Sequence, residues 1–93
     1  MAVMEVNIIP LGLGQPSIGD HIAKVARYLD DEHIPYELGD LGTSIEGETA
    51  WLLQLAARLH ELPFELGAQR VHMTINIDDR RDKEVHLGEK SRS

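Results

Sequence analysis

The chain has 93 residues, no cysteine and a formal net charge of −7, from nine Lys and Arg against sixteen Asp and Glu. This length suits one domain, the missing cysteine excludes disulfides and thiolate sites, and the negative charge disfavours nucleic acid and anionic membranes as partners. No stretch approaches the ~20 apolar residues of a membrane span, and residues 1–5 do not resemble a signal peptide. We expect a soluble, cytoplasmic domain over residues 1–87, followed by a disordered tail over 88–93.

The first predicted elements are a strand and a helix. Apolar and polar residues alternate over 4–8, which is the period of a strand, and Pro10 and Gly12 are expected to end it. Ser17 suits a helix N-cap, so a helix is expected over 17–32. The apolar residues of this helix recur at steps of four, three and four and form one face: Ile18, Ile22, Val25 and Leu29.

Two strands, a helix and a last strand are predicted to follow. Residues 34–41 and 43–46 read as strands that are separated by glycines. A second helix opens over 47–49, and Pro63 is expected to end or kink it because proline lacks an N–H and clashes with the preceding turn. Apolar and polar residues alternate most clearly over 70–78, which indicates a half-buried strand.

This order of elements predicts the α+β, ferredoxin-like βαββαβ fold, an antiparallel four-stranded sheet with two helices on one face. The other face of the sheet is expected to be polar. It would carry Glu5, Asn7, His72, Thr74 and Asn76. Such a face is either solvated or buried in an assembly, and the pattern alone leaves both open.

The run over 42–48 combines two hydroxyls, a carboxylate and two glycines between a strand and a helix. Glycines allow a ligand to approach the backbone closely, so this run suits a recognition wall. One alternative stays open. Thr43 and Glu46 also have the spacing of a capping box, in which both side chains would only satisfy amides at a helix start.

Other patterns give weaker signals. Gly12 and Gly14 resemble part of a dinucleotide fingerprint, but Ser17 replaces its third glycine and Pro16 interrupts the loop. The five histidines lack metal-ligand spacing and no catalytic triad is recognisable, so we expect no metal and no catalytic residue. The charged run over 78–83 contains both signs and is interpreted as a solvated, self-compensating cluster rather than an anion site.

Three motifs occur in an order that resembles a known family. They are Ile9-Pro10-Leu11-Gly12 followed by Pro16-Ser17, Tyr36-Glu37-Leu38 leading into Gly42-Thr43-Ser44-Ile45-Glu46-Gly47, and Gly67-Ala68-Gln69-Arg70-Val71 running into Ile75-Asn76-Ile77-Asp78-Asp79-Arg80-Arg81-Asp82-Lys83. Over nearly the whole chain, the sequence resembles the small thiamine-binding proteins of ferredoxin-like fold. Leu41, Pro63 and the segment around Gly88 depart from the family pattern. The resemblance implies binding of thiamine or its pyrimidine part, assembly as dimers or tetramers, and no catalytic residues.

Thiamine joins an aminopyrimidine to a cationic thiazolium, so its pocket needs hydrogen-bonding groups, an apolar slab and no excess positive charge. The ligand-binding residues expected on this basis are Ser17, Thr43, Ser44, Ile45 and Glu46. We therefore expect a non-catalytic, cytoplasmic thiamine-binding protein without a cofactor, which forms a homodimer or homotetramer and binds neither nucleic acid nor membranes. The alternatives are an amino-acid-binding regulatory module that uses the loop over 12–17, and a small enzyme, for which we find no residues.

Overall fold

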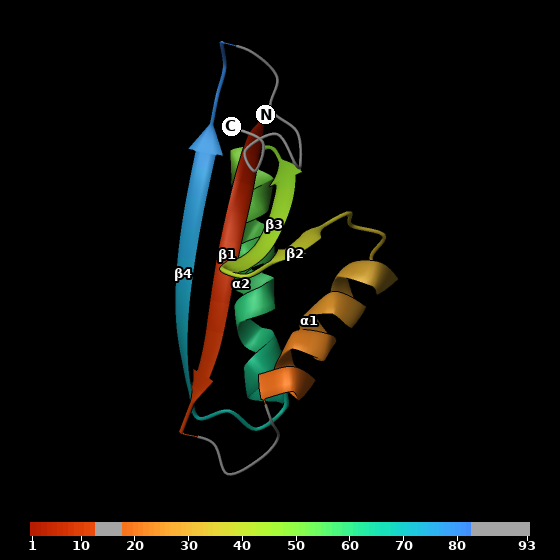
Figure 1. Cartoon of the computed structure of the whole chain (residues 1–93), viewed down its shortest axis with the longest axis vertical. Helices are drawn as coiled ribbons and strands as arrows, with labels where there is room; N and C mark the ends of the chain where they lie inside the picture. Colours follow the sequence, from red (N-terminus) through yellow and green to blue (C-terminus); the bar gives the residue numbers. More distant parts are fainter. Residues whose placement is uncertain (13–17, 83–93) are drawn as a thin grey trace.

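The chain folds into one antiparallel sheet with both helices on the same face (Figure 1). The computed structural model describes residues 1–12 and 18–82. Its elements are β1 (Ala2–Leu11), α1 (Ile18–Asp31), β2 (Glu37–Gly39), β3 (Gly42–Gly47), α2 (Thr49–Glu65) and β4 (Arg70–Asp79). The strand order is β2-β3-β1-β4, which confirms the predicted ferredoxin-like α+β fold. The expected domain end at residue 87 and the tail over 88–93 lie outside the described residues.

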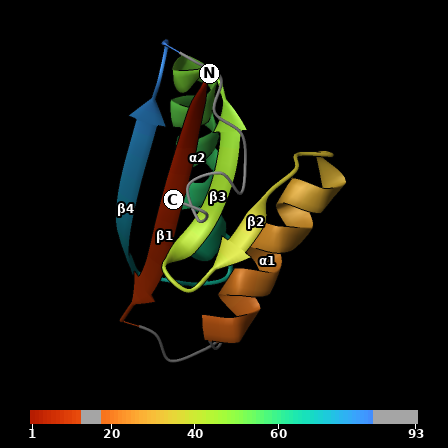
Figure 2. The same cartoon turned by 45° about the horizontal axis from the view of Figure 1, so that its top comes forward.

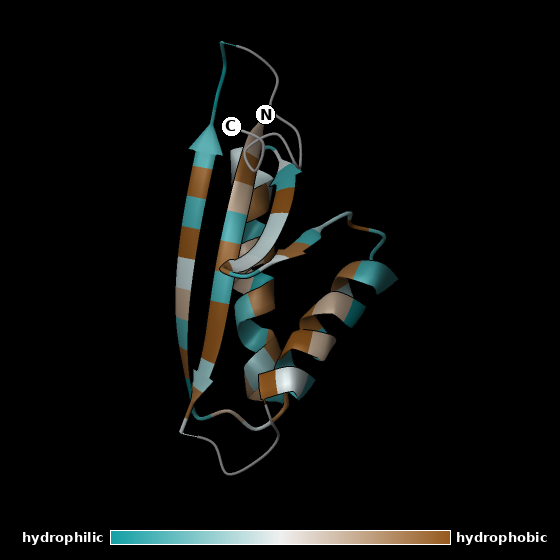
Figure 3. Ribbon diagram, viewed as in Figure 1, coloured by the Kyte–Doolittle hydropathy of each residue, from teal (hydrophilic) through white to brown (hydrophobic). Residues whose placement is uncertain are grey.

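The register of the strands separates a buried face from a polar one. Met4 pairs with Ile45 of β3 and Ile77 of β4, and paired residues point to the same face of a sheet. Met4 and Ile45 are fully buried under the helices, in a core that includes Leu29 of α1 and Leu52 of α2. Figure 3 shows the resulting alternation of hydrophilic and hydrophobic bands along β1 and β4.

The face of the sheet opposite the helices is polar, as the sequence predicts. Asn7 pairs with Thr74, and Glu5 pairs with Asn76 and Ser44, so these side chains share that face. We call it the open face. Within the described residues, no helix is long and apolar enough to cross a membrane.

Two strands differ in length from the prediction. β2 has three residues rather than the eight of 34–41, because Pro35 has no N–H for a ladder and Ile34 and Tyr36 pack against the core instead. β1 continues through Pro10 to Leu11. Proline is tolerated there because this part of β1 pairs with β4 on one side only.

The start of α2 excludes the capping box. The helix begins at Thr49 with Glu48 as N-cap and no side-chain cap hydrogen bond, whereas Thr43 and Glu46 lie within β3. Pro63 lies in the last turn, and the helix ends two residues later, in agreement with the expected effect of proline.

Gly47 and Trp51 give a direct test of packing at the junction of β3 and α2. A Cβ atom at Gly47 would lie 2.7 Å from the Cε3 atom of the Trp51 ring. Because overpacking of this kind typically costs about 1–3 kcal/mol, we expect Gly47→Ala to lower the free energy of unfolding by that amount. Urea denaturation followed by circular dichroism measures it.

The matched background for this test is Trp51→Ala, which removes the obstructing ring. In that background, Gly47→Ala should cost much less, because nothing remains for the new methyl group to displace. Equal losses in both backgrounds would show that the Trp51 ring is not the cause.

Candidate ligand-binding site

A pocket of about 240 Å³ lies between α1, the second half of β1 and the turn between β2 and β3. It is lined by Val6, Asn7, Ile8, Ile9, Pro10, Ile18, His21, Ile22, Val25, Leu38, Gly39, Asp40, Gly42, Thr43 and Pro63. Adjacent side chains of a strand point to opposite faces, so the five consecutive residues 6–10 can line one pocket only if β1 presents its edge. The pocket therefore has a strip of backbone along one side.

Among the described residues, β1 has no strand partner on the β3 side beyond Val6, because β3 is shorter than β1. β1 pairs with β4 from Ala2 to Leu11, but it pairs with β3 only from Ala2 to Val6. β3 begins at Gly42, where φ is +150° and a Cβ atom would lie 2.4 Å from the Val6 carbonyl oxygen. Only glycine permits this close approach, so the chain can turn away from β1 at this point.

Helix α1 forms the second wall of the pocket, on the β2 side of the sheet (Figure 2). Val25 is buried, whereas Ile18 and Ile22 are 51% and 52% exposed although they also line the pocket. The predicted apolar face of this helix is therefore only partly used by the core. Ile18 and Ile22 form an apolar rim that a ligand can cover.

Glu65 at the end of α2 links the two helices. Its carboxylate accepts a hydrogen bond from Arg58 at 2.8 Å and lies 3.4 Å from Lys24 Nζ of α1. The hydrogen bond from Arg58, and then that from Lys24, lower the pKa of Glu65. Arg58 also lies over the Tyr28 ring of α1, 5.2 Å from its centroid. Exposed pairs of this kind contribute only about 0–1 kcal/mol each to stability.

His21 is an unusual residue in this pocket. Its side chain is buried, and neither Nδ1 nor Nε2 has a hydrogen-bond partner among the described residues. Leaving a buried polar group unpaired typically costs about 1–3 kcal/mol. In the sequence alone, His21 is one of five histidines without metal-ligand spacing. The available signal was its spacing of four and eight residues from Val25 and Leu29, which places it on the apolar face of α1.

The polar groups of the pocket include hydrogen-bond donors, hydrogen-bond acceptors and one carboxylate. Besides the backbone edge of β1, they include the Thr43 hydroxyl, the His21 imidazole and the carboxylate of Asp40, which is exposed in the turn between β2 and β3. None of the described lining residues is Lys or Arg, so the pocket suits a neutral or cationic ligand rather than an anion. Its volume is below the ~300–1,000 Å³ of sites that enclose a drug-sized ligand, and fits one substituted ring.

The structure separates the residues that were predicted to form the site. Thr43 pairs with Val6, faces the helices and lines the pocket. Ile45 also faces the helices but is fully buried in the core and does not line the pocket. Ser44 and Glu46 point to the open face, because alternate residues of a strand have opposite directions. One pocket on one side of the sheet cannot use the side chains of all four residues.

Ser17 and residues 13–16 lie outside the described residues, so a contribution of Ser17 stays a prediction. Within residues 1–12 and 18–82, no group of three His, Cys, Asp or Glu side chains is placed to hold a metal ion.

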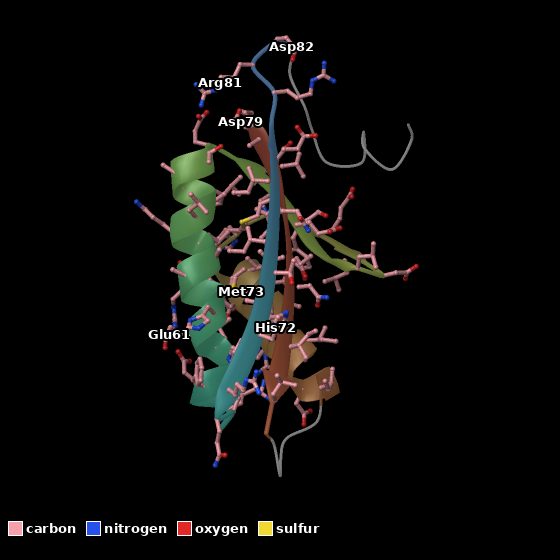
Figure 4. All side chains as sticks on the ribbon, turned by 90° about the vertical axis from the view of Figure 1, so that its left-hand side faces the viewer. Glu61, His72, Met73, Asp79, Arg81 and Asp82 are labelled. Atoms are coloured by element: carbon pink, nitrogen blue, oxygen red, sulfur yellow. The ribbon has the colours of Figure 1, made fainter. Side chains whose placement is uncertain are left out.

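The charged run at the end of β4 pairs with itself, as its mixed composition predicts. Arg80 donates from Nε and Nη2 to Asp82 at 3.1 and 2.7 Å. Arg81 donates to Asp79 at 3.0 Å; Figure 4 labels these two residues at the end of β4. Thr49 of α2 also donates to Asp79, at 3.0 Å. Asp79 is paired with Ala2, at the opposite end of β1 from the pocket. The interpretation as a self-compensating cluster is confirmed for residues 79–82, whereas Lys83 is outside the described residues.

Comparison with known proteins extends this description. The fold defines a small α+β protein of the ferredoxin-like class, and a family model described as "Thiamine-binding protein" matches residues 4–93. The chain therefore belongs to the thiamine-binding protein family. The UPF0045 protein YqgV of Bacillus subtilis is 40% identical over 97 residues, which cover 100% of this chain and 93% of that protein.

Solved structures share the fold. The hypothetical protein MJ1052 of Methanocaldococcus jannascii is 30% identical with a TM-score of 0.81, and the match covers 98% of this chain and 92% of that chain. A candidate thiamine biosynthesis or salvage protein of Thermotoga maritima matches with a TM-score of 0.68 over 96% of this chain and 92% of that chain. It is 21% identical, so this likeness concerns the fold alone.

Asp79 gives a pH-dependent test of the charged cluster. The hydrogen bonds from Arg81 and Thr49 lower the pKa of Asp79. A carboxylate with a lowered pKa stabilises the fold above its unfolded pKa of about 4, and this contribution is lost as the pH falls through the folded value. We expect Asp79→Asn to lower the melting temperature at neutral pH, and the difference from wild type to shrink as the pH approaches about 2.

Asp82→Asn is the matched control, because Asp82 accepts two hydrogen bonds from Arg80, only two residues away in the chain. Its effect on the melting temperature should be smaller. A constant difference between wild type and Asp79→Asn across the pH range would contradict the assigned ionic role.

Proposed function

We propose that this chain is a non-catalytic binding protein for thiamine or its hydroxymethylpyrimidine moiety, and that it acts in the cytoplasm as a carrier, buffer or sensor. The observation that carries the proposal is the pocket at the open edge of β1, in a chain that belongs to the thiamine-binding protein family. The family suggests the class of ligand. The size of the pocket and the lack of Lys and Arg in its described lining agree with a ligand of that class.

The chemistry of the pocket fits the two halves of thiamine. An aminopyrimidine is flat, so it can lie against apolar walls such as Val25 and Pro63 while its amine and ring nitrogens meet polar groups at its edge. The Thr43 hydroxyl and the backbone of β1 are suitable partners. The cationic thiazolium would extend toward the exposed carboxylate of Asp40 at the rim.

The proposal includes no chemical reaction. Nucleophilic catalysis requires a nucleophile in hydrogen-bond contact with a base. Among the described residues that line the pocket, no such pair is formed. Binding alone requires only the shape and polar groups that the pocket provides.

Variants on the two faces of β3 test this proposal. We expect isothermal titration calorimetry to detect thiamine binding, and Thr43→Val to weaken it about 2–10-fold, because a hydrogen bond in the pocket is lost. Ser44→Ala is the matched control on the open face, and it should leave the affinity unchanged. If instead Ser44→Ala and Glu46→Gln weaken binding while Thr43→Val does not, the ligand lies on the open face.

The same titrations distinguish ligand classes. Thiamine diphosphate should bind more weakly than thiamine, because Asp40 and the net charge of −7 oppose added negative charge. No detectable binding of thiamine or hydroxymethylpyrimidine would contradict the proposal. Stabilisation by an amino acid instead would favour the regulatory-module alternative.

Self-association forms a second part of the proposed function. β4 is a ten-residue edge strand. Among the described residues it is paired on one side only, and none of these residues forms a layer over the open face. Such edges and faces are common sites of pairing between subunits. We expect light scattering to give a dimeric or tetrameric mass at tens of micromolar protein.

A charge on the open face locates the contact. Thr74→Glu should reduce the mass if subunits pack through the open face, and should leave it unchanged if they pair along the β4 edge. A monomeric mass for the wild-type chain would contradict self-association.

A further inference from the structure

His21 is buried at a pocket wall without a partner in the described residues, and this combination needs an explanation. Its side chain is 3% exposed, and both ring nitrogens lack a hydrogen-bond partner there. The large majority of buried side-chain polar atoms in folded proteins have a hydrogen-bond partner. A histidine that only filled space at this position would lower the free energy of unfolding, because its buried ring nitrogens are unpaired. Leu or Phe would avoid this cost and would extend the apolar face that Val25 and Leu29 form.

The location of His21 indicates what its partner is. His21 lines the pocket together with apolar residues of three elements, including Val6 of β1, Ile22 of α1 and Pro63 of α2. These neighbours can contact the faces of a flat ring, but their side chains cannot form hydrogen bonds. His21 is therefore one of the few lining residues whose side chain can form a hydrogen bond with the polar edge of a ligand.

We infer that His21 is the specificity-determining contact for the heteroaromatic ring of the ligand, and that it hydrogen-bonds an edge carrying a donor amine beside an acceptor ring nitrogen. A neutral imidazole has one donor and one acceptor, so it can pair with either group of such an edge. This inference rests on the proposed function and adds to it the residue that selects the aminopyrimidine. Sites built to pair with a polar group discriminate strongly against analogues that lack it.

The test compares two pyrimidines and two variants. The probes are 4-amino-5-hydroxymethyl-2-methylpyrimidine and the same ring with hydrogen in place of the amine. Wild-type protein should bind the amino compound about 10-fold or more tightly than the compound without the amine. His21→Leu should bind both weakly and nearly equally, while its melting temperature stays at or above that of wild type, because an unpaired buried polar group has been removed.

His21→Gln and His72→Gln complete the design. Glutamine keeps one donor group and one acceptor, so His21→Gln should retain part of the preference for the amine. His72→Gln is the matched control, because His72 is exposed on β4 and does not line the pocket. It should keep the wild-type preference in full.

Nitrogen chemical shifts of the imidazoles provide an independent readout that does not require the Leu variant to fold. Adding the amino compound to wild-type protein should shift the ring nitrogens of one histidine, and that signal should be missing from whichever His21 variant folds. Ring nitrogens of His21 that do not move on saturation with the probe would overturn the inference, as would a His21→Leu protein that keeps the preference for the amine.

Failure of the inference can be distinguished from failure of the proposed function. If wild-type protein binds thiamine and His21→Leu binds it with the same affinity and preference, only the role of His21 is wrong. If wild-type protein binds neither thiamine nor the amino compound, the proposed function is wrong and the role of His21 is rejected with it.

Discussion

The difference in length between β1 and β3 is the constraint on which the pocket depends. β1 has ten residues and β3 has six, and their ladder ends where Gly42 meets the Val6 carbonyl. An unpaired backbone edge inside a protein costs free energy unless water, a side chain or a ligand satisfies it. Here the edge of β1 past Val6 forms one side of the pocket, so the geometry that shortens the sheet also supplies its hydrogen-bonding strip.

Helix α1 completes the pocket, because some of its apolar residues are buried in the core while others line the pocket. Val25 and Leu29 anchor the helix in the core, while Ile18 and Ile22 remain half-exposed at the pocket. Glu65 and Arg58 of α2 then hold α1 through exposed polar contacts with Lys24 and Tyr28.

The two ends of the sheet differ in their charged side chains. At the end of β4, arginines and aspartates pair with one another, and Thr49 ties this cluster to the start of α2. At the other end, the described residues that line the pocket include Asp40 and neither Lys nor Arg. The antiparallel register aligns Asp79 with Ala2, which places the charged cluster at the end of β1 opposite the pocket.

The sequence by itself determined the fold class, because the apolar periods of two and 3.6 residues and their order leave the ferredoxin-like arrangement as the natural solution. It also determined that Thr43 lies on a short strand beside Gly42, that the charged run compensates itself, and that the open face is polar. The sequence places Thr43, Ser44 and Glu46 in one short run, whereas in the structure Thr43 faces the helices and Ser44 and Glu46 lie on the open face, because alternate residues of a strand point to opposite faces.

Only the tertiary structure decided where the pocket lies. His21, Asp40 and the edge of β1 are far apart in the chain, and no local pattern joins them. They meet because β3 stops short of the end of β1 and α1 packs beside the gap. Local sequence specifies the helices, the strands and their apolar faces. The difference in strand length and the placement of α1 are properties of the whole fold, and they determine which polar groups face the pocket.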